Sequence, residues 1–339
     1  MSRRFRVAVP DAVLDDLRER LRRTRWPEPI PGAGWDYGTD VGYLRRLAEH
    51  WERDYDWRAA EARLNAHEQF IETVDGVDLH YLRIAGKGPA PFPLLLIHGW
   101  PGSVWEFIDL VGPLSDPAAH GGEPVEAFDL VVPSLPGFGF SGAPRERGWG
   151  ATRIAAALDE LMRRCGHDRY GSQGGDWGGI IGSQLGADHS DRCVAIHLNM
   201  SYAHLPPDPT LEQREWAARF RAFRGRESGY SAIQSTKPDS LTLAQNDSPA
   251  GLAAWIIEKF RTWADTGGDL EGSFARDDLL TNVMLYWVTA NAPSAARIYY
   301  EMREDEWAQT RPRVTVPTGV AAFPKEPFHD APLDLRDAL

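Results

Sequence analysis

The sequence predicts an α/β fold with one helical segment ahead of the sheet and a second helical segment inserted into it. Three observations support this prediction. The first 70 residues show helical periodicity, short apolar runs alternate with helical stretches between residues 94 and 198, and residues 206–302 read as mostly helical before a strand-like run at 314–323. Strands that alternate with helices indicate a parallel sheet with crossover connections. A helical insertion between two parts of such a sheet is how a lid is built.

Two amphipathic helices and a hairpin are predicted near the N-terminus. The first helix lies between Pro10 and Pro27, where apolar residues recur at helical spacing, and the second covers residues 41–51. Residues 70–81 then form two strand-like runs around Asp75-Gly76. This dipeptide is typical of a type I′ turn between antiparallel strands.

The central part of the chain predicts the parallel strands. Short apolar runs bounded by glycine or proline are typical of strands buried on both faces. The predicted elements are, in order, a strand at 94–98, a strand at 130–133, a helix at 151–164, a strand at 170–173, a helix at 177–185 and a strand at 193–198. The later run at 314–323 is interrupted by Pro317-Thr318-Gly319.

Composition excludes several classes of protein. The net charge of −12 argues against a nucleic-acid-binding surface, which is normally basic. Two cysteines, Cys165 and Cys193, cannot form a disulfide framework, and they favour a reducing compartment. The N-terminus lacks the apolar run of a signal peptide, and the longest apolar runs are far shorter than the ~20 residues of a membrane span. We therefore expect a cytoplasmic protein without a membrane anchor.

The motif GGDWGG at residues 174–179 is the sharpest chemical feature. It lies between a predicted strand and a predicted helix, and it has the small-x-nucleophile-x-small pattern of a nucleophile elbow, with Asp176 at the nucleophile position. Glycines are needed because the elbow is strained and other backbone lies close to it. The start of the next helix favours an ionised carboxylate. The alternative is a glycine-rich turn that carries an ordinary aspartate.

A second motif, HGWPGS at residues 98–103, follows the predicted strand at 94–98. In a fold with a nucleophile elbow, this position carries the oxyanion loop. We expect the backbone amides of Trp100 and Trp177 to converge on a developing negative oxygen. By itself the motif is also compatible with a simple turn.

With these motifs, the chain resembles the epoxide hydrolases of the α/β-hydrolase fold, in the microsomal and juvenile-hormone branch with a helical N-terminal domain. The resemblance covers residues 5–328. Its further motifs are WDYGT at 35–39, PSLPGFGFS at 133–141, STKPD at 235–239, PTG at 317–319 and FPKE at 323–326. It implies a helical N-terminal domain at 1–68, a first part of the hydrolase core at 69–205, a helical lid at 206–305 and a second, shortened part of the core at 306–339.

The resemblance also implies roles for individual residues. Asp176 matches the nucleophile, and Glu326 matches the acid that orients the catalytic histidine. Tyr230 and Tyr299 match two lid tyrosines that hold the epoxide oxygen, with Tyr300 as the alternative to Tyr299. The implied substrate is a small apolar epoxide, as in the detoxifying hydrolysis of cis-stilbene oxide. No cofactor or metal is implied, and a homodimer is an open expectation.

An aspartate suits epoxide opening for reasons that do not depend on the family. The attack occurs at a saturated carbon, and a carboxylate is already ionised at pH 7, so this step needs no base. The departing oxygen becomes an alkoxide, which neutral tyrosine hydroxyls can protonate. The resulting ester must then be hydrolysed by water, and that second step needs a general base and an oxyanion hole.

The 339 residues lack the Gly-Gly-His-Phe segment that carries the catalytic histidine in the family. His329 is the one candidate that follows both Asp176 and Glu326, but it is three residues from Glu326 and is a weak substitute. A structural role is the better interpretation of the other nine, which include His98 in the oxyanion loop, His197 at the end of a buried-looking strand and His204 where the lid begins. The sequence therefore leaves open whether the ester on Asp176 is hydrolysed.

Three functions remain compatible with the sequence. The first is an epoxide hydrolase that converts epoxides to vicinal diols. The second is a protein that is alkylated by epoxides and does not complete hydrolysis. The third is a haloalkane dehalogenase, which shares an aspartate nucleophile followed by tryptophan but lacks the N-terminal helical domain and the lid tyrosines.

Overall fold

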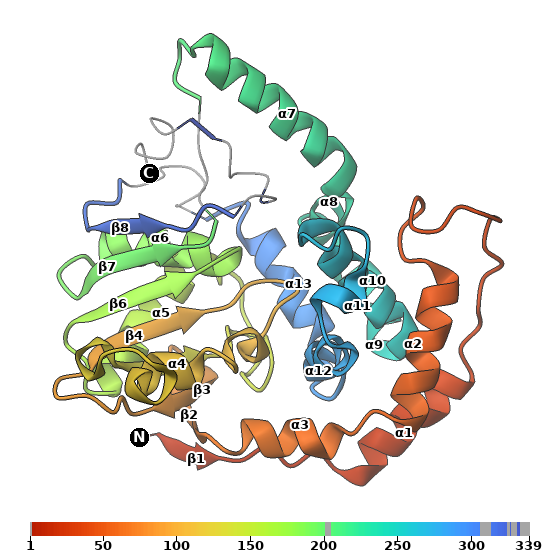
Figure 1. Ribbon diagram of the computed structural model, residues 1–339, viewed down its shortest axis with the longest axis horizontal. Helices are drawn as coiled ribbons and strands as arrows, with labels where there is room; N and C mark the ends of the chain where they lie inside the picture. Colours follow the sequence, from red (N-terminus) through yellow and green to blue (C-terminus); the bar gives the residue numbers. More distant parts are fainter. Residues whose placement is uncertain (1, 201–204, 306–312, 324–325, 327–330, 333–339) are drawn as a thin grey trace.

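The computed structural model describes residues 2–200, 205–305, 313–323, 326 and 331–332. Within these residues the chain forms one eight-stranded sheet with helices around it (Figure 1). The strands are β1 (Arg3–Phe5), β2 (Glu68–Val74), β3 (Val77–Ile84), β4 (Phe92–Ile97), β5 (Phe128–Pro133), β6 (Tyr170–Gly174), β7 (Cys193–Leu198) and β8 (Thr318–Val320).

The helices precede, connect and interrupt the strands of this sheet. The α-helices are α1 (Asp11–Arg22), α2 (Val41–Arg53), α3 (Trp57–Leu64), α4 (Val111–Ser115), α5 (Ala151–Arg164), α6 (Trp177–Asp188), α7 (Leu211–Glu227), α8 (Gly229–Gln234), α9 (Pro238–Asp247), α10 (Pro249–Trp263), α11 (Leu270–Ser273), α12 (Arg276–Trp287) and α13 (Ala292–Glu301). Short 3₁₀ helices are η1 (Val104–Phe107), η2 (Pro117–His120) and η3 (Pro124–Glu126).

The sheet is antiparallel at one end and parallel at the other. Its strand order is β1-β2-β3-β5-β4-β6-β7-β8, with antiparallel pairs from β1 to β5 and parallel pairs from β5 to β8. The parallel half confirms the predicted crossovers. The predicted hairpin is also confirmed, since Val74 pairs with Val77 and both turn residues have positive φ, 47° at Asp75 and 76° at Gly76.

The N-terminal segment differs from the helical expectation at two places. β1 pairs with β2 at the edge of the sheet, with Arg3 opposite Ile71, and α3 is a third helix that the sequence analysis did not predict. β1 consists of two arginines and one phenylalanine, which is too short a run to show the alternation of a strand, so the sequence carries no readable signal for it. α1 and α2 follow the predicted periodicity, and α1 buries Leu14, Leu17 and Leu21.

The helices α7–α13 form a segment between β7 and β8, called the helical insert below. In Figure 1, α8–α13 lie beyond the ends of the parallel strands, beside α1 and α2, and α10 contacts both of these N-terminal helices. The strand-like run at 314–323 is shorter than expected. Its paired residues are Thr318–Val320, so the Pro-Thr-Gly motif does not interrupt the strand but begins it. The Pro317 carbonyl accepts a hydrogen bond from the Ile196 amide at 3.0 Å.

Candidate active site

Asp176 lies at a sharp turn between β6 and α6. Its backbone has φ 51° and ψ −125°, and it is one of three non-glycine residues with positive φ in the described part of the chain. Such a conformation is strained for a residue with a Cβ atom, and residues held in it cluster at functional sites. α6 begins at the next residue, Trp177, so Asp176 occupies the N-cap position of that helix.

The glycines around this turn are required by close backbone contacts. A Cβ atom at Gly178 would overlap the carbonyl of Ile97 at the end of β4, and one at Gly174 would overlap the backbone of Gly178. The first turn of α6 can therefore approach β4 closely only with glycine at these positions. The glycines of the GGDWGG motif are therefore needed for packing as well as for the position of Asp176.

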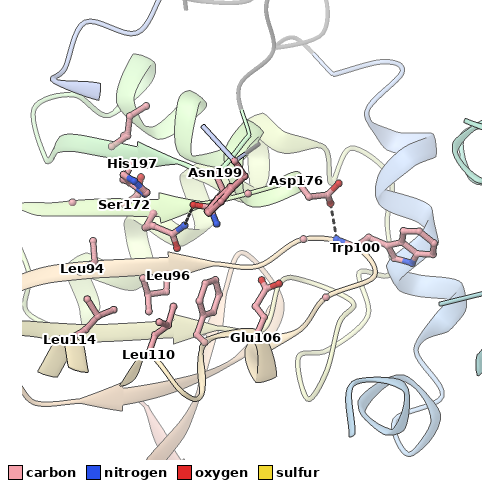
Figure 2. Close-up of a pocket in the computed structure, with 18 of the residues that line it drawn as sticks. Leu94, Leu96, Trp100, Glu106, Leu110, Leu114, Ser172, Asp176, His197 and Asn199 are labelled. Atoms are coloured by element: carbon pink, nitrogen blue, oxygen red, sulfur yellow. Dashed lines mark hydrogen bonds between the residues drawn. The ribbon is translucent and has the colours of Figure 1, made fainter. Parts of the chain in front are cut away.

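Two backbone amides act on the carboxylate of Asp176. The Trp100 amide donates a hydrogen bond to Oδ1 at 2.7 Å (Figure 2). Loss of solvation raises the pKa of Asp176 to about 6, and the amides of Trp100 and Trp177 counteract that rise. Asp176 is therefore mostly ionised at pH 7. The two amides expected to form an oxyanion hole thus meet at this carboxylate.

His98 holds the Trp100 loop in place. Its Nε2 accepts a hydrogen bond from the Leu135 amide at 3.0 Å, so the ring proton lies on Nδ1, which donates to the Gly99 carbonyl at 3.0 Å. Burial lowers the pKa of His98 to about 4, which keeps the ring neutral. The Phe138 ring packs edge-on against it, with centroids 5.2 Å apart. A structural role for His98 fits these contacts.

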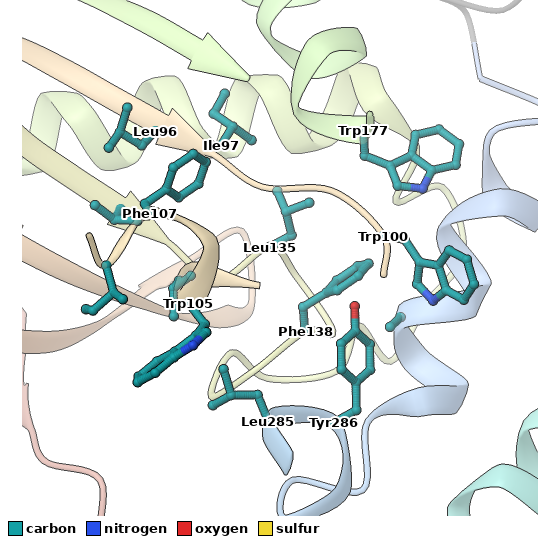
Figure 3. Packing of buried hydrophobic residues seen from close by; sticks show 14 of the residues in the cluster. Leu96, Ile97, Trp100, Trp105, Phe107, Leu135, Phe138, Trp177, Leu285 and Tyr286 are labelled. Atoms are coloured by element: carbon teal, nitrogen blue, oxygen red, sulfur yellow. The ribbon is translucent and has the colours of Figure 1, made fainter. Parts of the chain in front are cut away.

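α12 fixes the same loop from the side of the helical insert. Asn282 donates from Nδ2 to the Pro101 carbonyl at 2.7 Å and accepts from the Ser103 hydroxyl at 2.7 Å. The Tyr286 hydroxyl donates to the Gly102 carbonyl at 2.7 Å. Figure 3 shows Tyr286 beside Phe138 in the buried cluster that also contains the Trp100 and Trp177 rings. The sequence analysis missed both α12 residues, because the loop motif does not reveal which distant helix contacts it.

Tyr230 and Tyr299 come together near Asp176. Tyr230, on α8, stacks on the Trp100 ring with centroids 5.0 Å apart, and Tyr299, on α13, meets the Trp177 ring edge-on at 4.6 Å. The two tyrosine rings are 5.7 Å apart. The two tryptophans whose backbone amides act on Asp176 therefore also position the two tyrosine rings with their side chains.

Both tyrosines are neutral over the ordinary pH range. Burial, and then the charge of Asp176, raise the pKa of each phenol well above its usual value. The Tyr299 hydroxyl is buried without a hydrogen-bond partner in the described part of the chain, although Tyr230 and Trp177 are close enough to affect its pKa. An unpartnered buried hydroxyl is costly, so it is suited to a bound oxygen atom.

Tyr300 and Glu326 are the remaining predicted positions. Tyr300 lines a different, charged surface hollow with Lys237 and Arg297, so of the two neighbouring tyrosines it is Tyr299 that lies beside Trp177. Glu326 is half-buried, and burial together with the charge of Asp176 raises the pKa of its carboxyl to about 7. Glu326 is therefore close enough to Asp176 for their charges to interact.

Asp176 opens onto a cavity of about 870 Å³ (Figure 2). Its apolar lining includes Trp100, Phe260 and Trp263 near Asp176 and extends along the face of the sheet. Two charged side chains, Glu106 and Lys259, also line it, and neither was singled out in the sequence. A glutamate within the otherwise apolar VWEF run of residues 104–107 was a usable signal for Glu106.

Among the described residues, His197 is the one histidine that lines this cavity. His197 was expected to be buried, but its side chain is exposed to the cavity because alternate residues of β7 point to the open face of the sheet. In Figure 2, Asn199 lies between His197 and Asp176. His204 and the candidate base His329 lie outside the described residues.

Comparison with known proteins identifies the family. Residues 2–107 match the family "Epoxide hydrolase N terminus", and residues 93–327 match the family "alpha/beta hydrolase fold". Epoxide hydrolase 1 of Oryctolagus cuniculus is 34% identical over 359 residues, which cover 96% of this chain and 79% of the relative. The chain belongs to the epoxide hydrolases. It has the α/β-hydrolase fold with the epoxide hydrolase N-terminal domain, in the microsomal and juvenile-hormone branch.

Two solved structures of epoxide hydrolases share this architecture. Juvenile hormone epoxide hydrolase from the silkworm Bombyx mori is 31% identical with a TM-score of 0.87, over 94% of this chain and 82% of that one. Aspergillus niger epoxide hydrolase is also 31% identical with a TM-score of 0.87, over 100% of this chain and 87% of that one. The similarity confirms the predicted family and fold class.

The described residues contain no helix of the length and apolar character needed to cross a bilayer. They also contain no group of three or more histidine, cysteine, aspartate or glutamate side chains arranged to hold a metal ion.

Proposed function

We propose that this epoxide hydrolase family member opens epoxides by forming an ester between Asp176 and an epoxide carbon. One observation carries the proposal. An ionised carboxylate, fixed by the Trp100 amide at 2.7 Å, faces an apolar cavity close to two neutral tyrosines, Tyr230 and Tyr299, whose rings pack on Trp100 and Trp177. A nucleophile, acid donors and an apolar site are the parts that ring opening needs.

In the first step, an Asp176 oxygen attacks the epoxide carbon and the carbon–oxygen bond of the ring breaks. Tyr230 and Tyr299 donate hydrogen bonds to the ring oxygen, and one of them transfers its proton as the alkoxide develops. Their raised pKa values ensure that both are protonated at neutral pH. The proposed substrate is a small apolar epoxide, because the cavity near Asp176 is lined by aromatic rings.

In the second step, water attacks the carbonyl carbon of the Asp176 ester. The negative charge that develops on the carbonyl oxygen is stabilised by the amides of Trp100 and Trp177. The same amides donate hydrogen bonds to the free carboxylate. Glu326 is proposed as the acid that orients a base. The helical insert, within the predicted lid at residues 206–305, supplies the tyrosines, while residues 69–205 supply Asp176 and the amides.

A protein that is alkylated and keeps the ester is the second candidate. The position of the histidine in the cavity supports this second candidate. Among the described residues, His197 is the one histidine in the cavity lining, and Asn199 separates it from Asp176. The family assignment favours epoxides over haloalkanes as substrates, and assay of halide release from haloalkanes would detect the dehalogenase alternative.

Mass spectrometry after incubation with styrene oxide tests the proposal. We expect the peptide that contains Asp176 to gain the mass of one epoxide, either transiently with diol formation or persistently without it. The first outcome supports an epoxide hydrolase, and the second supports the alkylated protein. Asp176→Asn must abolish both, once sequencing of the peptide has excluded deamidation to aspartate. Diol formation by that variant, or absence of any adduct and diol in the native chain across a panel of epoxides, would refute the proposal.

A further inference from the structure

Trp177 carries a second polar group besides the backbone amide that acts on Asp176, namely the N–H of its indole ring. Trp177 is 6% exposed, and its Nε1 has no hydrogen-bond partner among the residues that the structure describes. Figure 3 shows this nitrogen on the edge of the indole toward the Trp100 ring. A buried donor without an acceptor destabilises the folded chain, and the two steps above give this N–H no role.

The Tyr299 hydroxyl lies beside this indole and is in the same condition. The two rings meet edge to face, with centroids 4.6 Å apart and planes at 83°. The Tyr299 oxygen is likewise buried without a hydrogen-bond partner in the described part of the chain. Burial, and then the charge of Asp176, raise the pKa of this phenol, and the Trp177 side chain is close enough to lower it. A donor and an acceptor that both lack a partner therefore lie side by side.

The contact with Tyr299 distinguishes Trp177 from other buried tryptophans. Nε1 of Trp149 is also buried without a partner within the described residues. The ring of Trp149, however, lies under the Arg153 guanidinium at 4.4 Å and lines a small cavity that does not include Asp176. An unpartnered indole N–H is therefore not by itself a sign of function. The ring that Trp177 contacts carries a hydroxyl that also needs a partner.

The chemistry of the two groups fixes the direction of a hydrogen bond between them. An indole N–H can only donate, whereas a phenol donates one proton and accepts through its oxygen lone pairs. The Tyr299 oxygen must therefore accept from Trp177, and the Tyr299 proton is left for another acceptor. The Tyr230 ring is 5.7 Å from that of Tyr299, so the oxygen of Tyr230 and an epoxide oxygen held between the two tyrosines are the acceptors at hand.

We infer that Trp177 is a positioning residue for Tyr299, whose oxygen accepts from the indole N–H so that the phenol proton is directed at the epoxide oxygen. The inference deepens the proposed ring opening and rests on it. A hydroxyl that is held by one hydrogen bond has fewer orientations to lose when the substrate binds. Fixing a donor before the reaction lowers the barrier for the step that uses it.

The same N–H stabilises the charge that ring opening places on Tyr299. As the carbon–oxygen bond breaks, the Tyr299 proton moves to the alkoxide, which leaves a phenolate on Tyr299 and a hydroxyl on the ester. The indole keeps its own proton throughout. Its hydrogen bond becomes stronger in this step, because a charged acceptor binds a donor more tightly than a neutral one. Trp177 thus contributes its indole to ring opening and its backbone amide to hydrolysis of the ester.

Trp177→Phe separates these two contributions. Phenylalanine keeps the backbone amide and an aromatic ring against Tyr299 but lacks the N–H. The chain is mixed with styrene oxide, quenched at short intervals and analysed for the mass of the adduct at Asp176. We expect ester formation in Trp177→Phe to slow roughly 10–100-fold, the contribution of one hydrogen bond to a charged group. The decay of the ester should remain at the native rate, because the amide is retained.

A double-mutant cycle shows whether Trp177 acts through Tyr299. In a Tyr299→Phe chain, adding Trp177→Phe should slow ester formation no further, because the oxygen that accepts the N–H is already absent. A purely structural role of the indole would slow formation by the same factor in both chains. The matched control is Trp149→Phe, which removes another buried and unpartnered N–H and should leave both rates unchanged.

An isosteric replacement keeps the test valid if Trp177→Phe does not fold. Site-specific replacement of the Trp177 indole by benzothiophene exchanges the N–H for sulfur and leaves the shape of the ring system nearly unchanged. We expect this chain to show the same slow ester formation as Trp177→Phe and native decay.

The outcomes distinguish this inference from the function on which it rests. Ester formation at the native rate in the benzothiophene chain refutes the role of the indole and leaves the ester at Asp176 intact. Equal slowing by Trp177→Phe with and without the Tyr299 oxygen, or decay that slows as much as formation, refutes it too. A native chain that forms neither adduct nor diol refutes the proposed function, and the role of the indole falls with it.

Discussion

Two sets of hydrogen-bond donors surround Asp176, and they come from different parts of the fold. The backbone amides of Trp100 and Trp177 belong to the sheet region, and the first of them donates to the carboxylate at 2.7 Å. The hydroxyls of Tyr230 and Tyr299 belong to the helical insert, and the Tyr299 hydroxyl has no hydrogen-bond partner within the described part of the chain.

The difference between the two sets separates two steps of the proposed reaction. Amides that are fixed on Asp176 stabilise charge on its own oxygens, which matters when the ester is hydrolysed. Hydroxyls on the insert can instead donate to the epoxide oxygen and stabilise its charge, which matters when the ring opens. Substitutions in the insert should therefore slow ester formation. Substitutions near the amides should instead change the free energy of unfolding or the pKa of Asp176.

Removal of one hydroxyl should have the largest effect on ring opening. In Tyr299→Phe, ester formation at Asp176 should slow by roughly 10²–10³-fold, the usual loss for one donor to a developing anion. The decay of the ester should remain at the native rate. Rapid quenching and mass spectrometry with styrene oxide would measure both rates. The matched control is Tyr300→Phe, which changes the neighbouring tyrosine in the other hollow and should leave ester formation unchanged. If ester formation is slow in Tyr300→Phe and proceeds at the native rate in Tyr299→Phe, Tyr300 rather than Tyr299 is the proton donor.

A change at the elbow should instead destabilise the fold. In Gly178→Ala, the added Cβ would overlap the Ile97 carbonyl, and the backbone must shift at a cost of about 2–3 kcal/mol in the free energy of unfolding. Urea denaturation would measure it. Gly225→Ala is the control, since Gly225 lies within α7 with open space around it, and alanine there should stabilise by up to about 1 kcal/mol. Equal effects of the two substitutions would contradict the packing explanation for the elbow glycine.

The same division explains what could be predicted from the sequence. Asp176, Trp100 and the parallel strands were predicted because a local motif brings each of them into place. The hairpin around Asp75-Gly76 was predicted for the same reason. The proximity of Tyr230 and Tyr299 was available from the family resemblance alone, because α8 and α13 meet through packing that no local pattern encodes.

Other features had no readable local signal. Asn282 and Tyr286 lie on α12, whose residues are nearly all buried, so no amphipathic pattern marks the face that contacts the loop. β1 is only three residues long, two arginines and a phenylalanine, and it is a strand because it pairs with the edge of β2. His197 was misjudged since an apolar strand sequence does not tell which of its faces is covered.

The pH dependence of ester formation should differ on the two sides of the neutral range. The pKa of Asp176 is about 6, and the ionised form is the nucleophile, so the rate should fall about tenfold for each pH unit well below 6. On the alkaline side, the rate should hold to pH 10, because the pKa values of Tyr230 and Tyr299 are raised and both remain protonated. Adduct formation measured from pH 4.5 to 10 would check both limbs. A rate that rises toward low pH would contradict Asp176 as the anionic nucleophile.

The smallest expected effect is a gain in stability when the carboxylate is removed. The pKa of Asp176 is raised from 3.8 to about 6 on folding, so the carboxyl group favours the folded state below pH 3.8, and this contribution is lost as the pH rises through 6. Asp176→Asn should therefore be more stable than the native chain by about 1–2 kcal/mol at pH 7.5, less than the full shift implies because the group faces the cavity. The difference should shrink toward pH 4, as urea denaturation at the two pH values would measure.

The control for this last effect has the opposite sign. Hydrogen bonds from Thr73 and then Arg3 lower the pKa of Asp78, so this carboxylate stabilises the folded state above its unfolded pKa, and Asp78→Asn should destabilise the chain at pH 7.5. A destabilising Asp176→Asn would mean that the amides of Trp100 and Trp177 compensate the carboxylate fully. The amides of Trp100 and Trp177 would then stabilise the carboxylate before the reaction as well as during it. Only the hydroxyls of Tyr230 and Tyr299 would stabilise the transition state more than the ground state.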